Sequence, residues 1–120
     1  MTPLDALLVA VGAAVGAPLR YLTNHWVRER LGGTAVAGTL VVNVVGSLVL
    51  GLLVGAGTTG APLALLGIGF CGGLTTFSTL ALELWDDLSA DRHPRAVANV
   101  ALSLTLGLGA AVLGWTLTHG

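Results

Sequence analysis

A pair of glycines followed by hydroxyl side chains lies inside one apolar stretch of the sequence. Gly72 and Gly73 are adjacent, and the hydroxyl residues that follow them are Thr75, Thr76, Ser78 and Thr79. Adjacent glycines in such a stretch favour a break in a helix, which exposes carbonyl groups to cations and N–H groups to anions. The segment therefore predicts an ion site. The alternative is a kinked helix whose hydroxyl groups bond back to their own backbone.

A second polar group lies in the preceding apolar stretch. Thr39, Asn43 and Ser47 are spaced by four residues, so in a helix they share one face. A side-chain amide in hydrocarbon is costly unless it has hydrogen-bond partners. Asn43 is therefore expected either to bond a neighbouring helix or to present its amide N–H groups to an anion.

The last apolar stretch repeats this pattern with Asn99, Ser103 and Gly107. Hydrogen-bond donors with no lysine or arginine among them suit a small anion that exchanges water for protein hydrogen bonds. Phe77 lies inside the hydroxyl cluster, and the edge of its ring carries partial positive charge that an anion can face. The alternative for Phe77 is a core or lipid-facing position.

Arg20 and Glu83 are the ionisable residues nearest the interiors of the apolar stretches. One interpretation makes them a vestibule pair, in which Arg20 attracts anions and Glu83 bonds polar groups at the mouth of a pore. In the other, Arg20 extends to the membrane surface and Glu83 belongs to the connection that follows it.

The composition identifies the environment in which these residues must act. Of the 120 residues, 54% are hydrophobic and only 9% are charged, against about 25% charged residues in soluble domains. So few charges do not cover the surface of a small soluble protein. This excludes a soluble enzyme, a nucleic-acid-binding protein and a disordered chain, and it indicates an integral membrane protein. The single cysteine, Cys71, excludes a disulfide framework.

The apolar stretches predict an all-α fold of four transmembrane helices in one domain, residues 1–120. A helix crosses a bilayer with about 20 apolar residues, and the four spans are 4–23, 34–56, 62–85 and 95–117. We expect the third helix to be broken near its middle, at the glycine pair. Small residues four positions apart predict close helix packing at Gly12 and Gly16, Gly51 and Gly55, and Gly69 and Gly73.

The arginines predict an orientation in the membrane. All five basic residues fall on the side of the first and third connections, and they are Arg20, Arg28, Arg30, Arg92 and Arg95. Basic residues favour the cytoplasmic side, whereas acidic residues such as those around Asp87 count little. Both termini are therefore expected outside the cytoplasm.

Three segments together resemble the Fluc/CrcB family of fluoride channels, namely Gly16–Tyr21, Gly38–Ser47 and Gly72–Thr79. Their order and spacing extend the resemblance over nearly the whole chain. The resemblance implies a passive channel that exports fluoride and relieves fluoride toxicity. It also implies the inner membrane of a prokaryote, contact with membrane lipids and an antiparallel dimer of two subunits with two pores.

The resemblance also assigns roles to particular residues. It implies a structural sodium ion held by the backbone carbonyls of Gly72 and Thr75. It places Asn43, Phe77, Thr79 and Ser103 in the lining of the pore and Arg20 and Glu83 in its vestibules. We add Thr39, Ser47 and Asn99 to the predicted lining because they lie on the polar faces described above.

Two departures from the family pattern concern the pore. Leu80 stands where many members have a second phenylalanine, and Asn99 stands where some have tyrosine. Family homodimers insert in both orientations, whereas five arginines on one side predict a single orientation. The hypothesis that follows is a heterodimer with a paired, oppositely oriented subunit.

Three other functions are alternatives to a channel. A small proton-coupled drug antiporter needs a carboxylate deep in a helix, but Asp5 and Glu83 lie near helix ends. A non-conducting assembly subunit of a heterodimeric channel is the second alternative. An intramembrane enzyme is disfavoured, because no His, Asp or Glu lies near the hydroxyl cluster to act as a base.

Overall fold

The computed structural model describes residues 2–32 and 35–120, and nearly all of these are helical. The helices are α1 (Pro3–Arg30), α2 (Ala35–Gly55), α3 (Gly60–Pro62), the π-helical segment η1 (Leu63–Cys71), α4 (Gly72–Leu74), α5 (Ser78–Ser89) and α6 (His93–Thr118). Within the described residues, four helical spans are long and apolar enough to cross a membrane, and the third comprises residues 60–89. The prediction of a multi-pass, all-α membrane protein is confirmed.

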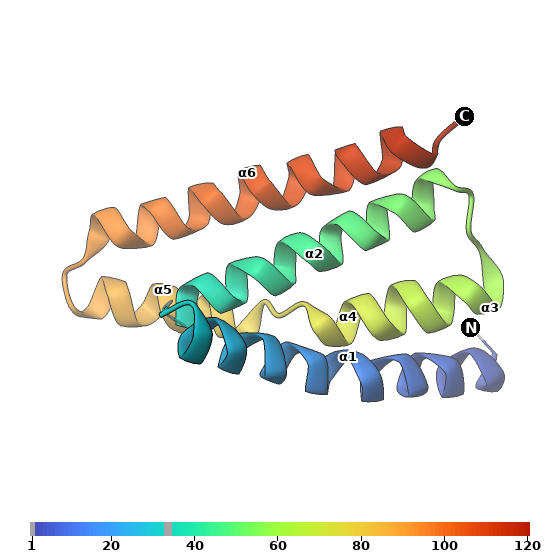
Figure 1. Cartoon of the computed structure of the whole chain (residues 1–120), viewed down its shortest axis with the longest axis horizontal. Helices are drawn as coiled ribbons and strands as arrows, with labels where there is room; N and C mark the ends of the chain where they lie inside the picture. The colour runs from blue at the N-terminus through green and yellow to red at the C-terminus, as the bar shows by residue number, and fades with distance from the viewer. Residues whose placement is uncertain (1, 33–34) are drawn as a thin grey trace.

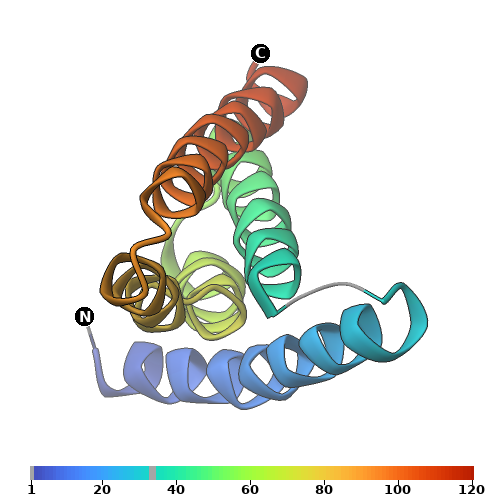
Figure 2. The same ribbon diagram turned by 90° about the vertical axis from the view of Figure 1, so that its left-hand side faces the viewer.

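The spans run up and down along the long axis of the molecule. Figure 1 shows both termini and the connection from α2 to α3 at one end, and the end of α1 and the turn from α5 to α6 at the other. Figure 2, seen from that second end, shows α1 crossing beneath the third span while α6 follows α2. The arginine-bearing connections therefore share one end of the molecule, as the sequence predicts.

Glycines mediate the two principal helix contacts. A Cβ atom on Gly12 or Gly16 of α1 would meet the backbone of η1 and α4, and one on Gly73 would meet Ala13 of α1. In the same way, a Cβ atom on Gly51 would meet the backbone of Ala111 in α6. Backbones pack this closely in lipid only where the side chain is absent or very small. The predicted packing roles of the spaced glycines are confirmed.

The first helix extends further than the hydropathy of the sequence indicates. It was expected to end at residue 23, but α1 continues to Arg30. Residues 24–30 are polar enough to leave the membrane, yet they contain neither glycine nor proline to end the helix. The helix stops just before Gly32, whose φ of 63° suits glycine. Polarity thus marks where a helix leaves the lipid, whereas the backbone determines where the helix ends.

The break in the third span is confirmed, but it lies after the glycine pair rather than at it. Gly72 and Gly73 begin the short helix α4, and the backbone becomes extended at Thr75, with φ −81° and ψ 159°. Helical structure resumes at Ser78. Gly73 stays helical because it packs on the backbone of α1. The backbone leaves the helical conformation only at residues 75–77, where side chains of α1 and α2 bond it.

Candidate ion site at the break in the third span

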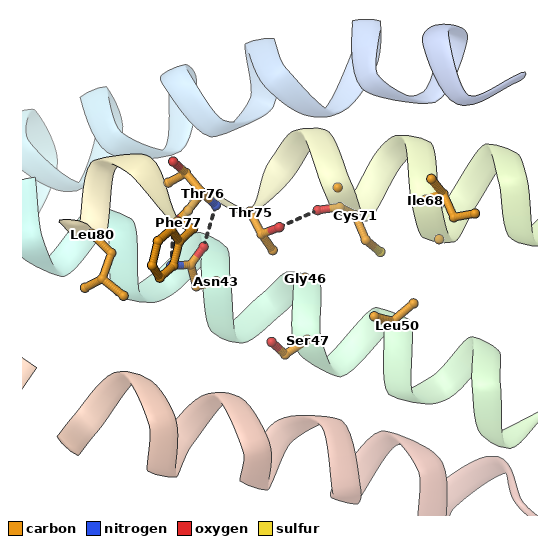
Figure 3. Close-up of a pocket in the computed structure, with 12 residues that line it drawn as sticks. Asn43, Gly46, Ser47, Leu50, Ile68, Cys71, Thr75, Thr76, Phe77 and Leu80 are labelled. Atoms are coloured by element: carbon orange, nitrogen blue, oxygen red, sulfur yellow. Dashed lines mark hydrogen bonds between the residues drawn. The ribbon is translucent and has the colours of Figure 1, made fainter. Parts of the chain in front are cut away.

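Asn43 of α2 holds the break through two hydrogen bonds to the backbone of one residue. The Thr76 N–H donates to Asn43 Oδ1 over 2.7 Å, and Asn43 Nδ2 donates to the Thr76 carbonyl over 3.1 Å. Figure 3 shows the amide facing this residue from α2. A backbone that leaves a helix inside a membrane must find new partners for its polar groups. The side chain of Asn43 supplies both partners for Thr76.

Arg20 of α1 reaches the same break from the other side. Its Nη1 donates to the carbonyl of Thr75 over 3.3 Å. The Thr75 hydroxyl and N–H both donate to the carbonyl of Cys71, over 2.9 and 3.0 Å. The guanidinium of Arg20 is thus hydrogen-bonded to the backbone of the third span.

Thr76, one residue before the N-cap Phe77, bonds the first turn of the helix that begins after the break. The N–H of Thr79 donates to Thr76 Oγ1 over 3.2 Å, and Thr76 Oγ1 donates to Thr79 Oγ1 over 3.1 Å. The hydroxyl of Ser78 lies 3.4 Å from the same oxygen. This is the side-chain capping that free N–H groups at a helix start require. The hydroxyl cluster therefore shapes the break, so the local bonding proposed as the alternative is also present.

A cavity of about 460 Å³ opens beside the break, between α2 and the third span. Its lining residues are Asn43, Gly46, Ser47, Leu50, Gly67, Ile68, Cys71, Gly72, Thr75, Thr76, Phe77 and Leu80. Figure 3 shows Phe77 and Leu80 at one end of the cavity and Leu50 and Ile68 at the other. Phe77 is 80% exposed, so its ring is available to a further chain or to an ion. Of the predicted site residues, Asn43, Ser47, Gly72, Thr75 and Phe77 meet here.

Arg20 and Thr79 bond at the break as well, whereas Thr39, Asn99 and Ser103 form a second polar group around Glu83. Thr39 Oγ1 donates to Glu83 Oε2 over 2.8 Å, and Asn99 Nδ2 donates to Glu83 Oε1 over 3.3 Å. Ser103 Oγ in turn donates to Asn99 Oδ1 over 3.3 Å. Thr39 and Asn99 are buried. Glu83 is thus bonded inward to α2 and α6, and it does not belong to the connection after α5.

Thr39 and Asn43 share one face of α2 but serve different partners. Thr39 bonds Glu83 of α5, whereas Asn43, one turn further along, bonds Thr76 at the break. The polar face of α2 therefore links the two polar groups. Sequence spacing identified the face, but it carried no signal for the pairing of Glu83 with Asn99, since residues 16 positions apart meet only through the turn between α5 and α6.

The break suits a monovalent cation bound by backbone carbonyls. In a continuous helix the Thr76 N–H would bond the Gly72 carbonyl, but here it donates to Asn43. Gly72 and Thr75 both border the cavity. Among the residues described, no group of three His, Cys, Asp or Glu side chains could hold a metal ion. At unwound membrane helices, backbone carbonyl oxygens can coordinate sodium. The Thr75 carbonyl oxygen already accepts a hydrogen bond from Arg20, and the positive charge of Arg20 disfavours a further cation at that oxygen.

The two sides of the break carry opposite partial charges. The carbonyl end of α4 and the N–H end of α5 face each other across residues 75–77. Helix ends contribute about half an elementary charge, negative at carbonyl ends and positive at N–H ends. The backbone at the break therefore carries partial charges of both signs.

Known proteins resemble this chain along most of its length. Residues 7–115 match the family model described as CrcB-like protein, Camphor Resistance (CrcB). The chain is 49% identical over 115 residues to a Rhodococcus jostii (strain RHA1) protein named Fluoride-specific ion channel FluC 2, covering 96% of this chain and 99% of the relative. It is 42% identical over 112 residues to Fluoride-specific ion channel FluC 1 of Nocardia farcinica (strain IFM 10152), covering 93% of this chain and 79% of the relative.

Proposed function

This chain belongs to the CrcB family, a family of channels rather than enzymes, and from that premise we propose that it is a subunit of a fluoride-selective passive ion channel. The observation that supports this function best is the broken third span, which borders a largely apolar cavity into which Asn43, Thr75 and Thr76 bring polar groups. The relatives named as fluoride-specific channels supply the identity of the ion. Four-helix packing alone does not require such a break.

Fluoride permeation needs donors that replace its water. Asn43 lines the cavity and carries two amide hydrogens, one of which the bond to Thr76 uses. The exposed ring edge of Phe77 and the hydroxyls of Thr79 and Ser103 extend the proposed path. Donors of this kind replace part of the hydration of an anion without binding it as tightly as a fixed cation would.

Export follows from the membrane potential. An inside-negative potential drives an anion outward by about 2.3 kcal/mol per 100 mV. A passive channel in the inner membrane of a prokaryote would therefore lower cytoplasmic fluoride and relieve its toxicity without another energy source.

We also propose a structural sodium ion and a second subunit. Gly72 and Thr75 would hold the sodium through their carbonyls, and two oxygens from one chain are too few for a complete shell. A second subunit in the inverted orientation would supply the others and cover the cavity beside Phe77. Arg28, Arg30, Arg92 and Arg95 lie at one end of the molecule, and no lysine or arginine lies at the other. This chain is therefore expected to adopt one orientation and to pair with an oppositely oriented subunit.

Fluoride efflux from liposomes tests the function. We expect purified chain, alone or with its oppositely oriented partner, to release fluoride only when valinomycin carries the compensating potassium. Chloride-loaded liposomes should show no release above protein-free liposomes. Valinomycin-independent release coupled to protons would contradict a passive channel and support an antiporter.

Leu80 favours a second candidate, a subunit that supports a partner without conducting well by itself. Leu80 lines the cavity beside Phe77 and presents no aromatic edge to an anion. If this candidate holds, replacing Leu80 with phenylalanine should raise fluoride efflux by the chain alone. An unchanged rate in Leu80→Phe would show that the side chain is not the limitation.

A further inference from the structure

Asp87, near the end of α5, is a buried carboxylate with two arginine neighbours. It is only 5% exposed, and its Oδ1 accepts a hydrogen bond from Arg92 Nε over 2.9 Å. Arg95 Nε lies 4.0 Å from the same oxygen. By contrast, the side chain of Asp91 in the adjoining turn is 94% exposed. A carboxylate is withdrawn from solvent in this way only when it is paired and hydrogen-bonded.

Asp87 lies on the same face of α5 as Glu83, one turn closer to the end of the helix. Its neighbour Arg95 lies one turn before Asn99 on α6. Asp87 with Arg95, and Glu83 with Asn99, thus form two successive links between the helices. In the described parts of the chain, these are the two acidic side chains of α5 that reach α6. The Asp87–Arg95 contact lies next to the turn between the helices. The Glu83–Asn99 contact, between predicted vestibule and pore residues, lies one helical turn further from it.

On their other side, α5 and α6 leave an apolar crevice of about 380 Å³ between them. Its lining consists of Leu84, Leu88, Ala96, Val97, Val100 and Ala101. Beyond the turn, α6 follows α2 rather than α5, as Figure 1 shows. Backbone hydrogen bonds from Ala90, Asp91 and Arg92 to α5 close the turn itself. The polar links are side-chain contacts that set the position of α6 relative to α5 beyond that turn.

We propose that Asp87 is a positioning residue of the channel, which anchors Arg92 and Arg95 so that Asn99 meets Glu83. Removing the carboxylate deletes the side-chain link next to the turn and leaves two arginines without their buried partner. The crevice then lets α6 move relative to α5, and the Glu83–Asn99 bond lengthens. The consequence for conduction rests on the proposed function, whereas the placement of α6 does not.

A distance measurement tests the placement independently of ion flux. Spin labels at Leu82→Cys in α5 and Leu104→Cys in α6 lie at exposed sites outside the crevice. The full chain would carry Cys71→Ala, and labelled chain would be diluted in unlabelled chain in liposomes so that distances within one chain are read. In Asp87→Ala we expect a longer and broader distance distribution. Asp87→Asn, which keeps the acceptor for Arg92, should restore most of the original distribution. An unchanged distribution in Asp87→Ala would overturn the proposal.

Fluoride efflux then tests whether Asp87 acts through the Glu83–Asn99 link. We expect Asp87→Ala and Asn99→Ala each to slow efflux at least tenfold, and the double variant to be no slower than the slower single variant. If the double variant slows efflux by the product of the two single effects, Asp87 acts independently of the Glu83–Asn99 link, and the proposal is overturned. Absence of efflux from the unmodified channel would instead contradict the proposed function, and the spin-label distances would still decide the placement of α6.

Discussion

Asn43 shows how one side chain combines a structural and a proposed ion-binding role. An amide deep in a membrane helix needs partners, and the sequence left open whether these were another helix or an anion. In the structure, its oxygen and nitrogen both bond the backbone of Thr76, so the interhelical alternative is present. The second amide hydrogen has a fixed direction as a result, which is the preorganisation that an anion site requires.

Replacing Asn43 with aspartate should abolish this arrangement. A carboxylate oxygen would take the place of Nδ2 and face the Thr76 carbonyl, so one buried hydrogen bond worth about 1–3 kcal/mol is lost. A negative charge would also stand beside the anion path. We expect at least tenfold slower fluoride efflux and a lower melting temperature. Efflux at the unmodified rate would contradict a role for Asn43 in the pore.

Ser47→Ala is the control for this variant. Ser47 lines the same cavity one turn away on α2, but the change to alanine adds no charge and removes no partner of the break. Its melting temperature should therefore stay close to that of the unmodified chain.

At the scale of the elements, glycines and side-chain bonds decide where helices pack and where the third span breaks. The sequence predicted the four spans and the glycine contacts because hydrophobic length and small-residue spacing are local properties. It misplaced the break by about one helical turn. Gly73 is held helical by its contact with α1, and Thr75–Phe77 are released by Arg20 and Asn43. These are contacts between segments far apart in sequence, so local flexibility at a glycine pair did not reveal them.

A methyl group at Gly12 should separate α1 from the third span. Its Cβ atom would meet the backbone of Leu65 and Phe70, which have no flexible end to move aside. We expect Gly12→Ala to destabilise the protein by about 1–3 kcal/mol, measured by thermal unfolding in detergent.

Gly109→Ala in α6 is the matched control, because open space surrounds that position. It should be neutral or stabilise the helix by up to about 1 kcal/mol. Equal destabilisation by the two variants would show that the glycines contribute through helix propensity rather than close packing.

At the scale of the whole molecule, the distribution of charge distinguishes the two ends. The arginines of the first and third connections lie at one end, and both termini lie at the other (Figure 1). Asp87 neutralises part of this charge within the protein, but acidic residues have little effect on orientation. Asymmetry of this degree is what a chain with one orientation in the membrane requires.

Tags at the two termini test the orientation. We expect both ends to be accessible from outside the cytoplasm in nearly every molecule, because the positive-inside rule acts on the four arginines of the first and third connections against none on the other side. Accessibility to a membrane-impermeant reagent in intact cells measures this, with lysed cells as the reference for full labelling. Comparable amounts of the two orientations would contradict the heterodimer hypothesis and favour a homodimer.

The sequence by itself determined the membrane environment, the four spans, the glycine contacts and the family resemblance. These depend on composition and on spacing along the chain, which each segment carries independently of the others. Only the tertiary structure decided which polar residues are partners: Asn43 with Thr76, Glu83 with Asn99, and Asp87 with Arg92. The physical reason is that a polar group within a membrane must be paired, and packing between helices determines which partner is within reach.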